Sequence, residues 1–352
     1  MVVLNKIYTR TGDGGDTGLG DGTRVPKYSI RVNSYGSVDE TNATVGMARL
    51  YCDGALDKKL AAIQNDLFSL CVSGDEKVRN YLDFSDAYFD EDSYLASVNV
   101  AHNLASLYFR AFDEPFAEEI RSYAINYFRK ILSKLGWEPK KSDKHTDALL
   151  RTFTIAVLGK MNDDDVTEVA LEKYKKFLKQ PGSLSPDLTE TICSIAAWNG
   201  NSKTFDELKK LYTNAKTMEQ KLRFLGAMCG FQDKKLLLKT LNFSQTPDVR
   251  SQNMQLPIMK VAGNPYGDRV LWQWLNKNWK KINKKVGHGN PLFNRIVASI
   301  VGVADDSMEK EIKLFFKNNP TPGTERTQTQ TLERIRINSR FLRSMKKEFK
   351  HG

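Results

Sequence analysis

The chain has 352 residues, of which 40% are hydrophobic and 27% charged, a composition typical of a globular protein with about two to three domains. This balance excludes a disordered or collagen-like chain, and no apolar run reaches the roughly 18 residues of a membrane span. Residues 1–4 are too short an apolar stretch for a signal peptide, so we expect a cytoplasmic protein without a membrane partner.

The net charge of +11 is carried entirely by the residues after position 70. Residues 1–70 hold eight Lys and Arg and eight Asp and Glu, whereas residues 277–285 and 326–350 are strongly basic. Such patches occur in nucleic-acid-binding proteins and also on the solvated faces of lysine-rich proteins. Because no zinc-finger or RNA-recognition motif accompanies them, we favour a solvated face and expect no nucleic-acid partner.

Cysteine and histidine are too scattered to predict a metal site. The four cysteines stand at wide spacings that fit neither a disulfide framework nor a zinc ribbon, and we expect buried free thiols at Cys52, Cys71, Cys193 and Cys229. The four histidines belong to no HExxH or HxH motif. We therefore expect neither zinc nor a catalytic residue in this chain.

Six of the 23 glycines lie between Gly12 and Gly22, which indicates a loop over residues 9–19. Small residues let backbone N–H groups turn toward one point, as phosphate-binding loops require, and Asp13 and Asp16 are suitable ligands for Mg²⁺ beside a polyphosphate. No Gly-Lys-Ser/Thr ends the loop, so it is not a Walker A motif. Composition alone leaves a flexible surface loop and a nucleotide site equally open.

Two helices are predicted after this loop, over residues 31–50 and 56–70. Three sequence segments occur in this order along the first part of the chain: KIYTRTGDGGDTGLGDGTRVPK, RVNSYGSVDETNATVGMAR and IQNDLF. Together they resemble the N-terminal part of the PduO-type corrinoid (cob(I)alamin) adenosyltransferases. The resemblance implies a triphosphate loop that binds ATP with Mg²⁺, through Thr9, Arg10, Thr11, Gly12, Asp13, Gly15, Thr17 and Lys27. The family's second, arginine-rich half of the site is absent after residue 70.

Residues 75–352 read as a series of helices with short polar breaks, which predicts an all-α, HEAT-like helical-repeat superhelix. Capping boxes are predicted at Thr204 with Glu207 and at Thr217 with Gln220. Aromatic residues such as Trp198 and Trp272 are expected in the core. The expected helices span 92–110, 115–135, 145–160, 164–180, 187–199, 204–215, 217–229, 232–241, 247–262, 267–284, 291–303, 306–318 and 323–349.

Four sequence segments in this part carry a second resemblance, at residues 78–112, 196–212, 219–253 and 319–342. They resemble the C-terminal helical domain of the gluzincin aminopeptidases, such as puromycin-sensitive aminopeptidase and the tricorn-interacting factors. In that family the domain forms a bowl over a separate zinc-bearing catalytic domain. The HExxH helix and the GAMEN-type loop are absent from this chain. The resemblance therefore implies peptide or protein binding without hydrolysis, with Lys277, Lys281, Arg336 and Arg340 as candidates for attracting a substrate carboxylate.

The two resemblances meet at residues 63–68, where one helix serves both families and no Gly/Ser/Pro linker intervenes. We expect a chimeric chain with an incomplete adenosyltransferase-like segment over residues 1–65 and an aminopeptidase-type helical-repeat domain over residues 66–352. The leading hypothesis is a non-catalytic peptide- or protein-binding domain. The alternatives are an ATP:cob(I)alamin adenosyltransferase and an aminopeptidase component completed by a zinc-bearing partner.

Overall fold

The structure, a computed structural model, describes residues 16–18, 24–26, 55–88, 94–286, 291–302 and 304–350. The chain divides into two compact units, Met1–Lys58 and Lys59–Gly352. In the first unit, β1 (Asp16–Gly18) pairs antiparallel with β2 (Arg24–Pro26), with Thr17 opposite Val25. Residues 16–18 of the expected glycine-rich loop thus belong to a short two-stranded ladder, which the composition did not predict because glycine is depleted in strands.

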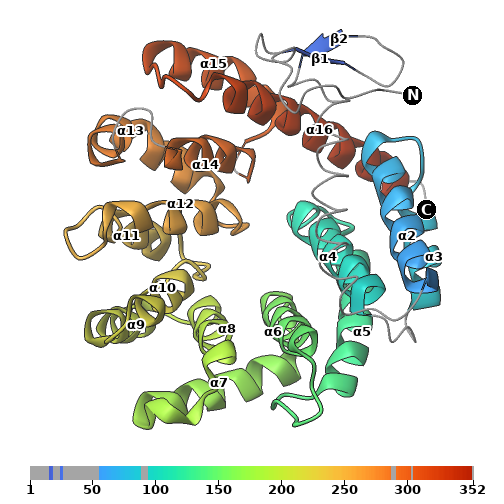
Figure 1. Cartoon of the computed structure of the whole chain (residues 1–352), viewed down its shortest axis with the longest axis vertical. Coiled ribbons are helices and arrows are strands. Elements are labelled where there is room, and N and C mark those ends of the chain that lie inside the picture. The colour runs from blue at the N-terminus through green and yellow to red at the C-terminus, as the bar shows by residue number, and fades with distance from the viewer. Residues whose placement is uncertain are drawn as a thin grey trace, which may run out of the picture. The chain divides into compact units, whose positions relative to one another are not determined.

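In the described part of the second unit every regular element is a helix, as the all-α prediction requires. Most of these helices form two rows. In the inner row each helix contacts the next one, and its members are α4 (Tyr94–Arg110), α6 (His145–Lys160), α8 (Pro186–Trp198), α10 (Met218–Ala227), α12 (Gln255–Ala262), α14 (Leu292–Ser299) and α16 (Glu325–Lys350). An outer row alternates with it along the chain (Figure 1): α5 (Ala117–Leu135), α7 (Asp164–Lys179), α9 (Ser202–Asn214), α11 (Lys234–Phe243), α13 (Asp268–Val286) and α15 (Glu309–Asn318).

The remaining helices are short or stand at the start of the unit. They are α2 (Ala55–Ser73), α3 (Val78–Ser85) and five 3₁₀ turns, at Asp86–Tyr88, Pro181–Ser183, Ser251–Asn253, Ile300–Gly302 and Asp306–Met308. The boundary between the two units falls inside α2. Among the described residues, no helix combines the length and the apolar run that crossing a membrane requires.

Most predicted helices begin and end within three residues of the observed ones, and the differences have local causes. The capping box expected at Thr204 is wrong: α9 begins at Ser202, because the side chain of Asn201 accepts a hydrogen bond from Lys203 N at 2.9 Å. Thr217 does cap α10, accepting from Gln220 N at 3.2 Å. The helix expected over residues 247–262 is broken, and only its second half, α12, is α-helical.

The apolar faces of the two rows meet in one continuous core. The aromatic residues expected there are buried: Trp198, Phe224, Trp272 and Phe315. Cys71, Cys193 and Cys229 are free and buried, as predicted, and burial raises the pKa of Cys71 and Cys229 to about 12. Cys52 lies outside the described residues.

The last helix of the unit packs against the first ones. The carboxylate of Glu348 accepts hydrogen bonds from Val78 N at 3.0 Å and Arg79 N at 2.7 Å, and so caps α3 from α16. Next to it, the ring of Phe349 stacks on Phe116 with centroids 4.7 Å apart, and the guanidinium of Arg79 lies 4.6 Å from the Phe349 centroid. The two ends of the unit are therefore joined by direct contacts.

Candidate binding pocket on the inner row

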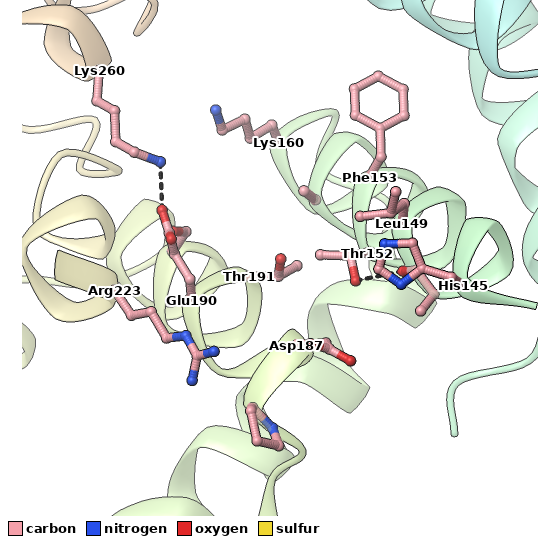
Figure 2. A pocket seen from close by; sticks show the side chains of 14 residues that line it. His145, Leu149, Thr152, Phe153, Lys160, Asp187, Glu190, Thr191, Arg223 and Lys260 are labelled. Atoms are coloured by element: carbon pink, nitrogen blue, oxygen red, sulfur yellow. Dashed lines mark hydrogen bonds and ion pairs between the residues drawn. The ribbon is translucent and has the colours of Figure 1, made fainter. Parts of the chain in front are cut away.

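A pocket of about 550 Å³ opens on four consecutive helices of the inner row, α6, α8, α10 and α12 (Figure 2). Most of its wall comes from one stripe of α6 and one stripe of α8, whose members recur at three- and four-residue steps. The lining residues are His145, Ala148, Leu149, Thr152, Phe153, Ala156, Lys160, Pro186, Asp187, Glu190, Thr191, Ser194, Arg223 and Lys260.

One end of the pocket is charged. The ammonium of Lys260 on α12 forms an ion pair with the carboxylate of Glu190 on α8, and Figure 2 shows this pair bridging the two helices. Arg223 on α10 is paired along its own helix with Glu219, at 2.6 Å, and is only partly buried. The acid and base of each pair largely compensate one another.

Lys160, at the end of α6, has no such compensation. No hydrogen bond or ion pair joins its ammonium to any described residue; its closest described interaction is with the ring of Phe109, whose centroid lies 5.9 Å away. Burial lowers the pKa of Lys160, and the neighbouring charge of Lys260 lowers it further. In Figure 2 the ammonium groups of Lys160 and Lys260 point into the same space. Of the lysine and arginine side chains that line the pocket, Lys160 is thus the one without an ion-pair partner among the described residues, although the charge of Glu190 acts to raise its pKa.

The other end of the pocket combines apolar side chains with polar ones, His145, Thr152 and Asp187. Leu149 lines it and remains 51% exposed. Phe153 lies beside it and stacks on His102 of α4, with centroids 4.1 Å apart. The hydroxyl of Thr152 donates to Ala148 O at 2.8 Å, so its hydrogen is already used within the helix. A ligand here meets an apolar surface next to a cationic one.

Close approach of the inner helices depends on two glycines. A Cβ at Gly159 of α6 would lie 2.5 Å from Cγ1 of Ile195 on α8. A Cβ at Gly226 of α10 would lie 2.5 Å from Oε1 of Glu190. Gly226 therefore leaves room for the Glu190–Lys260 pair to cross over α10.

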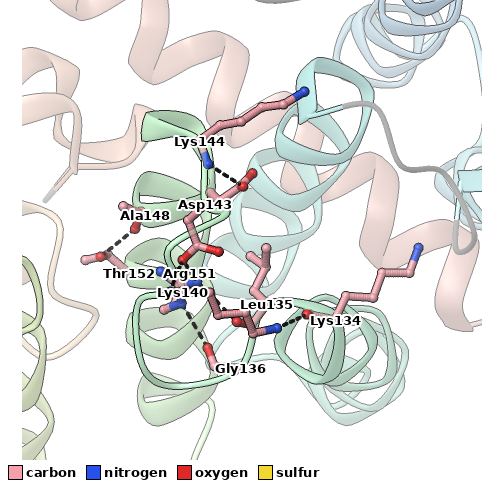
Figure 3. Close-up of polar contacts among 10 residues, drawn as sticks. Lys134, Leu135, Gly136, Lys140, Asp143, Lys144, Ala148, Arg151 and Thr152 are labelled. Atoms are coloured by element: carbon pink, nitrogen blue, oxygen red, sulfur yellow. Dashed lines mark hydrogen bonds and ion pairs between the residues drawn. The ribbon is translucent and has the colours of Figure 1, made fainter.

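A buried arginine holds α6 on the side away from the pocket (Figure 3). Arg151 is 1% exposed and donates to Leu135 O at 3.1 Å and Gly136 O at 3.0 Å, the last carbonyls of α5. Its guanidinium also pairs with Asp143 at 2.5 Å. Asp143 in turn accepts from Lys140 N at 2.8 Å, a contact that lowers its pKa together with the pairing to Arg151. These contacts fix the segment between α5 and α6.

The residues that the sequence singled out are not those of the pocket. Lys277 and Lys281 are exposed on α13 of the outer row, and Arg340 is exposed on α16. Arg336 binds Glu309 with both arms of its guanidinium, at 2.7 and 2.5 Å. Of the residues implied for ATP, the backbone of Thr17 lies in β1, whereas Thr9, Arg10, Thr11, Gly12, Asp13, Gly15 and Lys27 lie outside the described residues.

Four residues that were not predicted from the sequence make the charged end of the pocket: Lys160, Glu190, Arg223 and Lys260. A signal was present in α6, where a second stripe through His145, Leu149, Phe153 and Lys160 runs beside the core stripe. Within the described residues, no three His, Cys, Asp or Glu side chains gather as metal ligands do.

Comparisons with known proteins agree with this architecture. Residues 54–337 match the ERAP1-like C-terminal domain, which covers most of the chain, so the chain belongs to this family of helical domains. Residues 7–91 match the cobalamin adenosyltransferase family. The chain therefore joins segments similar to two families, and the two matches overlap across α2 and α3.

The individual relatives are aminopeptidases. Aminopeptidase M1-D of Oryza sativa subsp. japonica is 28% identical over 81% of this chain and 33% of its own length. Aminopeptidase M1 of Arabidopsis thaliana is 26% identical over 81% of this chain and 33% of its own. Aminopeptidase 2 of Candida albicans is 25% identical over 78% and 30%. The chain spans about a third of the length of these curated relatives.

Proposed function

We propose that the helical unit is a non-catalytic binding domain that holds a peptide, or a peptide-like segment of a protein, in the pocket on α6, α8, α10 and α12. The relatives are named aminopeptidases, and this chain matches about a third of them, so a peptide is the ligand class that the family suggests. The observation that carries the proposal is the unpaired ammonium of Lys160 beside Lys260 at one end of the pocket.

Electrostatics favours a carboxylate at the charged end. A partly desolvated ammonium without a partner raises the free energy of the empty protein, and an anionic ligand relieves that cost when it binds. A peptide's C-terminal carboxylate beside Lys160 would also share Lys260 with Glu190. The adjacent Leu149 and Phe153 offer an apolar surface to the side chain next to that carboxylate.

Fluorescence anisotropy with a labelled peptide tests this assignment. In Lys160→Met we expect the affinity for a peptide with a free C-terminal carboxylate to fall by about tenfold, as loss of one charge-assisted contact predicts. Lys281→Met, which removes an exposed lysine from the outer row, is the control and leaves the affinity unchanged. Equal affinities for wild type and Lys160→Met would refute the pocket assignment.

The match of residues 7–91 supports a second candidate function, ATP binding with Mg²⁺ by the N-terminal segment, as in an ATP:cob(I)alamin adenosyltransferase. Calorimetric binding of ATP that is lost in Lys27→Ala would support it, and no heat at millimolar ATP would remove it. The third candidate is an aminopeptidase completed by a zinc-bearing partner. It requires that peptide hydrolysis appear only when such a subunit is added.

A further inference from the structure

The side-chain amine of Lys160 is exceptional among the lysines of the described chain in combining three features. It lines a pocket large enough for a small molecule, about 550 Å³. It has no described carboxylate or carbonyl partner that would hold its proton, whereas Lys260 is bound to Glu190 and Lys285 donates to three backbone carbonyls. Finally, a second cation, Lys260, lies close enough to lower the pKa of Lys160 by charge repulsion.

We propose that Lys160 is a covalent capture site for small aldehydes and ketones that carry an anionic group, which it binds as an imine. This inference goes beyond peptide binding and does not depend on it. It uses the neutral amine of Lys160 as a nucleophile, whereas the peptide proposal uses its charge.

The chemistry needs no redox partner. The nitrogen of Lys160 forms a bond to the carbonyl carbon, and the carbonyl oxygen leaves as water with the two protons that the nitrogen gives up. A C=N bond replaces the C=O bond, and the reverse reaction consumes one water molecule. Lysines placed in apolar surroundings or next to another cation are the ones that act in this way, because a larger share of their amine is neutral at pH 7.

The surrounding charges select an anionic carbonyl compound. The titratable groups that line the pocket with Lys160 are His145 on α6, Asp187 and Glu190 on α8, Arg223 on α10 and Lys260 on α12, and the thiol of Cys229 lies nearby. Lys260 and Arg223 are the two cations of this set; each is paired with a glutamate, so a phosphate or carboxylate of the ligand would share them with Glu190 and Glu219. The apolar surface of Phe153 and Leu149 suits a flat or aromatic ligand body.

Pyridoxal 5′-phosphate is a suitable probe because it joins an aldehyde, an aromatic ring and a phosphate. The full chain is incubated at neutral pH with less than one equivalent of the probe and reduced with borohydride, and the modified lysines are located by mass spectrometry. We expect Lys160 to carry about tenfold more label than the average exposed lysine, since a lowered amine pKa increases the neutral fraction. The advantage should shrink as the pH approaches 10.

Two variants and a second probe separate the parts of the proposal. Lys160→Arg replaces the amine by a guanidinium that forms no imine, so it should lose the label at this position; Lys277→Arg on the outer row should leave the label on Lys160 unchanged. Pyridoxal without phosphate should label Lys160 about tenfold less in wild type, and Lys260→Met should abolish this preference for the phosphate. Label spread over the exposed lysines, an unchanged pattern in Lys160→Arg, or equal labelling by both probes would overturn the proposal.

Discussion

At the scale of single residues, α6 carries one cation with several partners, Arg151, and one without an ion-pair partner among the described residues, Lys160. Arg151 satisfies its guanidinium with two helix-end carbonyls and Asp143, and it is almost fully buried. Lys160 stands on the same helix, partly buried, with its ammonium unpaired in the described structure. Since burial of an unpaired charge costs free energy, the first residue serves stability and the second is a candidate for function.

Arg151 gives the clearest stability prediction. Arg151→Met would leave two carbonyls of α5 without their donor and Asp143 without its cation, and we expect the free energy of unfolding to fall by about 3 kcal/mol. Urea unfolding followed by circular dichroism measures this loss. Lys141→Met, an exposed change in the same segment, is the control and should cost less than about 0.5 kcal/mol. A similar small cost for Arg151→Met would show that the buried network is not required.

Glu309 gives a pH prediction. Its hydrogen bonds with Arg336 and Lys313 lower its pKa from 4.5 to about 2. A carboxyl group whose pKa is depressed in the folded state stabilises the protein fully above pH 4.5 and loses that contribution as the pH falls toward 2. The difference in urea midpoint between wild type and Glu309→Gln should therefore shrink from pH 6 to pH 3. Glu172→Gln, at an exposed position, should show no such trend, and a constant difference for Glu309→Gln would contradict the assignment.

At the scale of elements, the helices were predictable and the pocket was not. Local signals defined the helices: apolar stripes at helical spacing, breaks at glycine, and caps such as Thr217. The pocket depends on Lys160, Glu190 and Lys260, which come from three helices and are brought together only by the packing of the inner row. The sequence around each of these residues does not indicate that the three side chains line one pocket. The ladder of β1 and β2 was also missed, because its residues have loop-like composition.

The cap that joins α16 to α3 is testable as an element-level contact. Glu348→Ala removes the acceptor of Val78 N and Arg79 N, so we expect a loss of about 1 kcal/mol and faster amide hydrogen exchange at these two residues. Lys347→Ala, at the exposed neighbouring position, is the control. Unchanged exchange at Val78 and Arg79 in Glu348→Ala would mean that α3 is held by other contacts alone.

At the scale of the whole molecule, one family match covers residues 54–337, most of the chain, and a second covers residues 7–91, about a quarter of it. The all-α second unit and its family could be predicted from the sequence, because the four segments that carry the resemblance are spread from residue 78 to residue 342 and the match to the family extends over residues 54–337. The matched region corresponds to about a third of the length of the relatives. Binding, rather than hydrolysis, is the activity that we propose for it.

The most direct test of that proposal is the ratio of two dissociation constants, measured on the wild-type chain for one peptide with a free C-terminal carboxylate and for the same peptide as its amide. Pairing of the carboxylate with Lys160 predicts that the acid binds about tenfold more tightly than the amide at neutral pH. Equal affinity of the two peptides would contradict the account.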